Sequence, residues 1–191
     1  MATAFTVRQA LFLSSVFLFS ACGGQIELQS FNTDSLRLEN RNGIAYNEGK
    51  AFSGSVFELS KTHDTIAVSS FYKGQEHGQW KRFYPGGRLE ELRYFEKGVK
   101  VKTLTRWWEN GQMQLICSFR NGEYDGILKE WNESGQLTKK MHYKNGYEDG
   151  GQKMYYDNGK IRSNYVVKDG QRIGLLGTKN CVNVSDSVFK K

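Results

Sequence analysis

The sequence contains few of the residues from which catalytic sites are usually built. Its 191 residues include only 3 histidines and 3 cysteines. The histidines, His63, His77 and His142, have no spacing that would bring them together at a metal site or a catalytic pair. A glycine-rich phosphate loop and a nucleophilic serine motif are also missing. We therefore predict that the chain is not an enzyme, with no catalytic residues, no metal ligands and no cofactor.

Two aspartates recur in a pattern that is also seen in calcium-binding loops. Asp125 and Asp149 each lie in the sequence Gly-x-x-Asp-Gly. A hard cation such as calcium needs six to eight oxygen ligands, and too few acidic residues lie near these two. The pattern therefore favours a structural role in turns.

The sequence has no hydrophobic run long enough to span a bilayer as a mature helix. The longest apolar stretch is LFLSSVFLFSAC, and Arg8 is the only charged residue before it. Its end, Phe19 to Cys22, resembles the lipobox of bacterial lipoproteins. The resemblance implies that residues 1–21 are a signal peptide and that Cys22 carries lipid, which predicts a lipid-anchored protein of the bacterial cell envelope. By resemblance to other lipoproteins, Gly23 directly after the lipidated cysteine is compatible with sorting of the protein to the outer membrane. The alternative is an ordinary signal peptide or a short anchor, with Cys22 as a spare thiol.

Glycine, in contrast, is abundant and regularly spaced. Of the 21 glycines, five recur with a period of 24 residues and are predicted to be structural turns: Gly74, Gly98, Gly122, Gly146 and Gly170. A second glycine follows four residues later, except that Lys102 takes this place in the copy that begins at Gly98. Such regularity is typical of a stack of one supersecondary unit.

Each copy has the pattern of a β-hairpin. Two short runs rich in aromatic residues are separated by turn signals such as Asn110-Gly111, and Asn121-Gly122 joins one copy to the next. Because every connection is short, neighbouring strands must pair antiparallel. The only proline, Pro85, lies in a turn. We predict an all-β, elongated, single-layer antiparallel array of hairpins.

The alternation of side chains within the second strand of a copy predicts one apolar face. In one copy this set is Met113, Leu115, Cys117 and Phe119, and in the last full copy it is Ile161, Ser163, Tyr165 and Val167. Glu91, Arg93 and Lys139 interrupt the pattern in other copies, so we expect this face to be only partly buried. Cys117 is expected to be a buried thiol, the alternative being a disulfide with Cys181.

Five segments follow from these patterns. Residues 1–21 form the signal peptide, 22–35 a flexible tether, 36–49 a hairpin that caps the first edge of the sheet, 50–174 the hairpin repeats, and 175–191 a C-terminal tail. A degenerate first copy begins near Lys50.

The residues that could bind a ligand are aromatic and basic. The candidate binding face consists of Trp80, Tyr84, Trp107, Trp108, Trp131, Tyr155, Tyr156, Lys81, Arg106 and Lys129. The alternative is that these rings only cover the backbone of a thin sheet. The net charge is +7 and falls to +6 when residues 1–21 are removed, because Arg8 is their only charged residue. An excess of this size is typical of a solvated surface.

The segments GQEHGQWKRFYPGGRLEELRYFEKG and NGIAYNEGKAFSGSVFE resemble the MORN-repeat-variant family of bacteria, whose members are sometimes labelled antitoxin-like. The resemblance implies an elongated hairpin array without catalytic residues. Two hypotheses on the function remain. One is a non-enzymatic, membrane-anchored interaction or envelope-scaffold protein with an unknown protein partner. The other is a module that binds anionic lipid headgroups or cell-wall glycan. Nucleic acid is not an expected partner, because export removes the chain from it.

Overall fold

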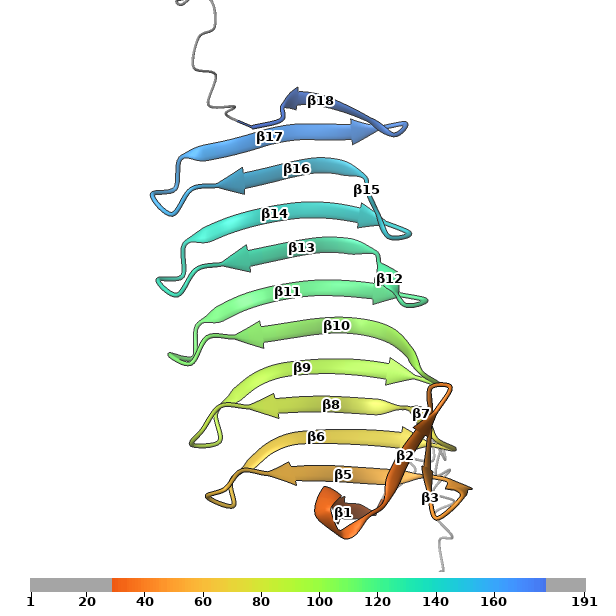
Figure 1. Ribbon diagram of the computed structural model, residues 1–191. Helices are drawn as coiled ribbons and strands as arrows, with labels where there is room; N and C mark the ends of the chain where they lie inside the picture. Colours follow the sequence, from red (N-terminus) through yellow and green to blue (C-terminus); the bar gives the residue numbers. More distant parts are fainter. Residues whose placement is uncertain (1–28, 178–191) are drawn as a thin grey trace, which may run out of the picture.

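The computed structural model describes residues 29–177, which form one long sheet and one small sheet (Figure 1). The long sheet has 15 strands, 12 of which follow one another in the order β1-β5-β6-β8-β9-β10-β11-β13-β14-β16-β17-β18. From β5 onward every pair is antiparallel, and the described residues contain no α-helix. The predicted all-β hairpin array is therefore confirmed. The strands from β5 onward in this path are β5 (Gly54–Leu59), β6 (Thr65–Tyr72), β8 (Gly78–Phe83), β9 (Leu89–Glu96), β10 (Val99–Trp107), β11 (Met113–Arg120), β13 (Gly126–Trp131), β14 (Leu137–Lys144), β16 (Gly150–Tyr155), β17 (Ile161–Lys168) and β18 (Gln171–Leu175).

Three two-residue strands lie at one end of the hairpins. They are β7 (Gln75–Glu76), β12 (Glu123–Tyr124) and β15 (Tyr147–Glu148), and they pair with the ends of β6, β11 and β14. The turn before β12 has Asn121 at φ 51° and Gly122 at φ 87°, so both of its central residues are left-handed. This geometry is that of the tight hairpin turn that Asn-Gly favours.

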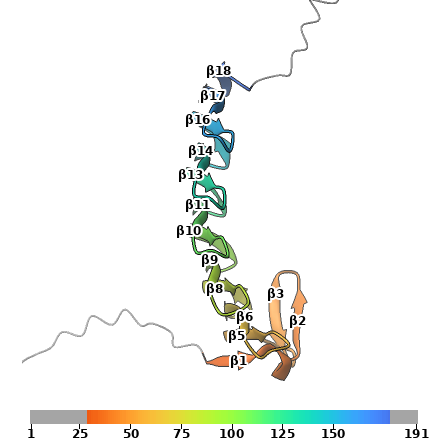
Figure 2. The same ribbon diagram turned by 90° about the vertical axis from the view of Figure 1, so that its left-hand side faces the viewer.

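The N-terminal residues form a three-stranded sheet of their own. It consists of β2 (Leu38–Arg41), β3 (Ile44–Asn47) and β4 (Lys50–Ala51). Figure 2 shows the long sheet from its side as one layer, with β2 and β3 beside its lower end. The two sheets join at Gly74, whose N–H donates to the Phe52 carbonyl and whose carbonyl accepts from the Ala45 N–H.

This arrangement differs from the predicted cap. We expected a hairpin at 36–49 to cover the first edge of the long sheet, but β1 (Ser30–Asn32) pairs with that edge instead, parallel to β5. Residues 30–35, which were assigned to a tether, form β1 and the 3-10 turn η1 (Thr33–Ser35). A parallel pairing between segments about 25 residues apart has no local turn signal, so the sequence did not indicate it. The predicted signal peptide 1–21, residues 22–28 of the predicted tether with Cys22, and residues 178–191 of the predicted tail with Cys181 lie outside the described residues.

The two sides of the long sheet differ in burial. We call the side that carries the Cys117 side chain the Cys117 face, and the opposite side the Lys129 face. Residues that pair across antiparallel strands share a face, and this pairing puts ten of the most buried residues of the chain on the Cys117 face. They are Val56, Glu91, Phe95, Cys117, Leu128, Met141, Gln152, Ser163, Tyr165 and Val167.

A recurring β-bulge limits the predicted alternation. The register shifts once in every repeat, for example between Arg106 and Trp107, where Met113 rather than Gln114 lies opposite Trp107. Met113 therefore leaves the face that Leu115, Cys117 and Phe119 share. Ile161, opposite Tyr155, leaves in the same way and is 47% exposed. The prediction was wrong at these two positions, because one extra residue reverses a two-residue period.

A single layer gains a core here because aromatic side chains pack along the Cys117 face. Rings contact one another in the series Phe31, Phe52, Phe71, Trp80 and Phe95, with centroids 5.0–6.0 Å apart. A second series consists of Phe119, Tyr124 and Tyr143, in which β12 places Tyr124 over the face. Each such pair contributes about 0.5–1.5 kcal/mol beyond the burial of its area.

Candidate binding surfaces

The ten residues of the predicted binding face do not lie on one face. Trp80 and Arg106 lie on the Cys117 face, because they are opposite Arg93 and Leu115. Lys81 and Lys129, by the alternation of their strands, lie on the Lys129 face. The prediction of one shared surface is therefore wrong, although the individual residues are placed where the period of two puts them.

Three of the predicted aromatic residues hold the repeats together. The Trp80 indole N–H donates to the Ser70 carbonyl, 3.0 Å away. The Tyr84 hydroxyl donates to the Trp107 carbonyl and the Trp108 indole N–H to the Trp131 carbonyl, each at 3.0 Å and each reaching into the next repeat. These contacts favour the structural alternative for these rings. Of the remaining aromatic residues, Trp107, Trp131 and Tyr155 are half-buried and Tyr156 is 42% exposed.

Three lysines form a row across the Lys129 face. Lys129 lies directly opposite Lys140, and Lys140 lies directly opposite Lys153 on its other side. Among the residues that the structure describes, none of the three has a carboxylate within ion-pair distance. Like charges directly opposite one another in a sheet are destabilising, so this row is not explained by stability. Lys129 and Lys153 could be identified as basic residues from the sequence, but the pairing that places Lys140 between them depends on the register.

The charges that interrupt the Cys117 face are paired within the protein. The Glu91 side chain is 4% exposed and forms ion pairs with Arg93 and, at 2.5 Å, with Arg106. Lys139 pairs with Glu130 at 2.9 Å. A buried carboxylate requires such partners, so the Glu91 charge is satisfied, and the two arginines around it leave a net positive charge there.

Cys117 is a free thiol that is 1% exposed. Burial raises the pKa of this thiol to about 11, since the charged thiolate loses its hydration there. Reactive cysteines are exposed and have a lowered pKa, so Cys117 is a packing residue.

No set of side chains in residues 29–177 is arranged to hold a metal ion, as no three of its histidine, cysteine, aspartate and glutamate side chains gather at one place. The Asp125 N–H donates to the Ser118 carbonyl, and the Asp149 N–H donates to the His142 carbonyl in the same way one repeat later. The Asp125 carboxylate pairs with Arg120. Asp125 thus lies at the break between β12 and β13, and Asp149 at the break between β15 and β16. The predicted structural role in turns is corrected to one at these breaks. The described region also contains no helix with the length and apolar character that crossing a membrane requires.

The comparison with protein families gives one match. Residues 76–97, 124–145 and 148–169 match the family described as MORN repeat variant. Three segments of the chain are therefore similar to MORN-variant repeats. The matched segments leave out residues 98–123, the copy in which Lys102 replaces a glycine. These repeats suggest a repeat-based binding or scaffold module.

Comparisons with other known proteins add no argument. No curated protein sequence matches the chain. A solved structure of a TarM mutant from S. aureus is similar at 12% identity over 73% of this chain and 21% of that chain, with a TM-score of 0.25. A GtfA/B complex bound to UDP and GlcNAc is similar at 11% identity over 66% of this chain and 23% of that chain, with a TM-score of 0.23. This chain thus spans about a fifth of the length of those chains, and TM-scores this low support no inference on fold or function.

Proposed function

We propose that this chain is a non-enzymatic, lipid-anchored repeat protein of the bacterial cell envelope, with a role as a protein-interaction or scaffold module, and that it binds its partner through strand β18. The observation that carries the proposal is the exposure of this strand. All five residues of β18 are exposed, and Ile173 and the adjoining Leu176 are 60% and 59% exposed. Within the described part of the chain, no strand pairs with the outer side of β18.

Open sheet edges attract other strands, because their N–H and C=O groups have no partner in the sheet. At the opposite end of the sheet the edge of β5 is not open, since β1 pairs with β5 and the three-stranded sheet packs beside it. A partner that adds a strand to β18 would gain backbone hydrogen bonds and contacts with the exposed apolar side chains.

Site-specific crosslinking in the native cell tests this proposal. A photoreactive residue at position 173 is expected to give one adduct of defined mass. A second substitution, Arg172→Pro, is expected to remove it, because the register set by the two-residue turn at 169–170 points the Arg172 N–H to the open edge and proline has no N–H to donate there. Position 161 is the matched control, since Ile161 is 47% exposed but lies on β17, inside the sheet. Equal adducts from both positions would contradict binding at the edge. An antitoxin role would require a toxin as this partner, which the mass of the adduct identifies.

The lipid anchor has its own test. Mass spectrometry of the native N-terminus is expected to show a chain that begins at Cys22 and carries acyl groups, and Cys22→Ser is expected to release the protein from the outer-membrane fraction. A native chain that retains residues 1–21 would contradict the anchor.

A second candidate function is the binding of anionic lipid headgroups or cell-wall glycan, and the lysine row Lys129, Lys140 and Lys153 supports it. A soluble form that begins at Gly23 keeps residues 29–177, which form both sheets. This form is expected to bind vesicles of phosphatidylglycerol and to dissociate at moderate salt. Changing the three lysines to glutamine should abolish binding, whereas a control with the same change of charge should not. The control changes three exposed lysines outside the row, namely Lys73, Lys144 and Lys168. Equal loss in both variants would show that only net charge matters.

A further inference from the structure

The repeat that begins at Gly98 is built differently from the others. In the neighbouring copies a short strand and a long strand are separate, as in β12 and β13, with a glycine such as Gly126 at the start of the long one. Here β10 runs without interruption from Val99 to Trp107, and Lys102 takes the position of the glycine at φ 58°. The register between β10 and β9 shifts between Val101 and Thr105. The periodic structure is therefore broken at one place, near the middle of the sheet.

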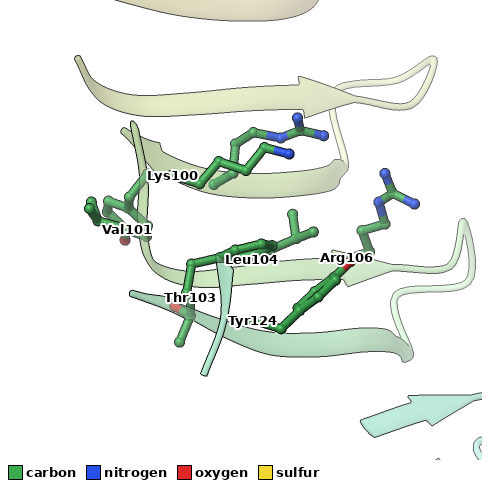
Figure 3. A pocket seen from close by; sticks show the side chains of 9 residues that line it. Lys100, Val101, Thr103, Leu104, Arg106 and Tyr124 are labelled. Carbon is green, nitrogen blue, oxygen red and sulfur yellow. The ribbon is translucent and has the colours of Figure 1, made fainter. Parts of the chain in front are cut away.

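A cavity of about 260 Å³ lies beside this break on the Cys117 face. In the next copy the corresponding position to Lys100 is Tyr124, whose ring packs against Phe119 and Tyr143. Lys100 supplies no ring, so the aromatic cover is interrupted between the two ring series. Figure 3 shows Leu104 at the centre of the cavity, with the Tyr124 ring on one side and Lys100 on the other. Its nine lining residues are Arg93, Tyr94, Lys100, Val101, Thr103, Leu104, Arg106, Phe119 and Tyr124.

The charge that faces this cavity is positive. Arg93, Lys100 and Arg106 line it, and no acidic residue does. Glu91 lies behind and pairs with both arginines. In the described residues Lys100 has no carboxylate within ion-pair distance, and its ammonium lies 5.7 Å from the centre of the Phe119 ring. Glu76 also acts on this cluster: burial raises the pKa of its carboxyl, and Arg93 and Lys100 oppose that rise.

The lining combines one unpaired cation with apolar walls. Leu104 and the rings of Phe119 and Tyr124 supply apolar surface beside Lys100, and surroundings of low polarity strengthen the attraction between Lys100 and an anion. The volume lies slightly below the range of ordinary ligand pockets, roughly 300–1,000 Å³, so it fits a small molecule rather than a polymer.

We propose that this cavity is a binding site for a small organic anion, a carboxylate or a phosphate monoester on an apolar body, with Lys100 as the residue that holds the anionic group. This site is independent of both binding functions proposed above, because it lies on the Cys117 face and away from β18 and the lysine row. It lies at the copy that departs from the repeat pattern.

Amide-resolved NMR titrations of the soluble form from Gly23 test the proposal, with hydrocinnamate, phenyl phosphate, inorganic phosphate and hydrocinnamyl alcohol as probes. At least one of the two aromatic anions is expected to give saturable shifts at the amides of Leu104, Phe119 and Tyr124. The better of the two identifies the anionic group as carboxylate or phosphate. The neutral alcohol and inorganic phosphate should each bind about tenfold more weakly, because the alcohol lacks the anionic group and inorganic phosphate lacks the apolar body.

Two variants and a control complete the test. Lys100→Gln should weaken binding about tenfold, while Lys168→Gln, which changes an exposed lysine of β17, should leave it unchanged. Leu104→Trp should fill the cavity and abolish binding with the fold retained, because Trp80 holds the corresponding position two strands earlier. The spectrum of each variant reports directly whether it folds. The proposal is overturned if neither aromatic anion gives saturable shifts at these amides, if inorganic phosphate binds as well as phenyl phosphate, or if both lysine variants behave alike.

Discussion

Two glycines at the same repeat position allow the attachment of the N-terminal sheet to be measured. Gly74 and Gly98 both have left-handed backbone, at φ 79° and φ 80°. A Cβ atom at Gly98 would meet nothing within 4 Å. At Gly74 it would overlap the Ile44 side chain and lie 2.8 Å from the Ala45 carbonyl oxygen. The substitutions Gly74→Ala and Gly98→Ala therefore share the same backbone strain and differ in the clash alone.

The expected magnitudes follow from this difference. Placing alanine in the left-handed region costs about 1–2 kcal/mol in both variants. In Gly74→Ala the three-stranded sheet must also move away, which breaks the hydrogen bonds that Gly74 makes with Ala45 and Phe52. Two such bonds contribute about 1 kcal/mol each, and the buried Ala45 is exposed as well. We expect Gly74→Ala to lower the free energy of unfolding by about 2–3 kcal/mol more than Gly98→Ala.

Urea unfolding and hydrogen exchange measure this effect. Urea unfolding of both variants gives the difference in stability. Amide exchange at Ala45, whose N–H donates to the Gly74 carbonyl, reports the detachment locally, which matters because repeat proteins do not always unfold in one step. Exchange at Ala45 should accelerate in Gly74→Ala and stay unchanged in Gly98→Ala. Equal losses of stability in the two variants, with Ala45 still protected in both, would refute the docking described here.

Three further outcomes are expected. In a soluble chain with Cys181→Ser, Cys117 should react with a thiol reagent only after unfolding. Because burial raises the pKa of this thiol to about 11, its contribution to stability is fully present below the pKa of an unfolded thiol, about 8.5, and is lost as the pH rises through about 11. The urea midpoint of unfolding should therefore fall as the pH is raised between these two values. Glu91→Ala should cost about 2–4 kcal/mol in urea unfolding, because it leaves two arginines without their buried partner, whereas Glu90→Ala, at a weak 4.0 Å pair, should change stability by less than about 1 kcal/mol. Lys102→Gly should raise the stability by up to about 1 kcal/mol, since it relieves left-handed strain at φ 58°, and a lower melting temperature would argue against that strain.

The order of the strands could be predicted because the connections are short. Turn sequences such as Asn121-Gly122 restrict the backbone locally to a tight reversal, and a tight reversal leaves antiparallel pairing as the only choice. The buried thiol at Cys117 followed from the same local rule, since side chains alternate between the faces of a strand.

The candidate binding face was less predictable. The sequence grouped Trp80 with Lys81 and Lys129, but a surface depends on which strands are neighbours and in what register. The bulge beside Trp107 shifts that register by one residue, and the lysine row appears only when Lys140 is placed between Lys129 and Lys153. The missing glycine at Lys102 was a signal for the break beside the cavity. The cavity's positive charge, however, comes from Arg93 of β9 and from Lys100 and Arg106 of β10, and strands β11 and β12 complete its lining.

The sequence by itself determined the repeating unit, its period, its antiparallel pairing and the absence of recognisable catalytic motifs. These properties depend on residues that are near one another in the chain, such as turn glycines and alternating side chains. Only the tertiary structure decided that β1 covers the first edge in parallel, that the N-terminal sheet docks on Gly74, and which charges neutralise one another on the Cys117 face. These are contacts between distant segments, and their free energy depends on a register and a packing that no local pattern encodes.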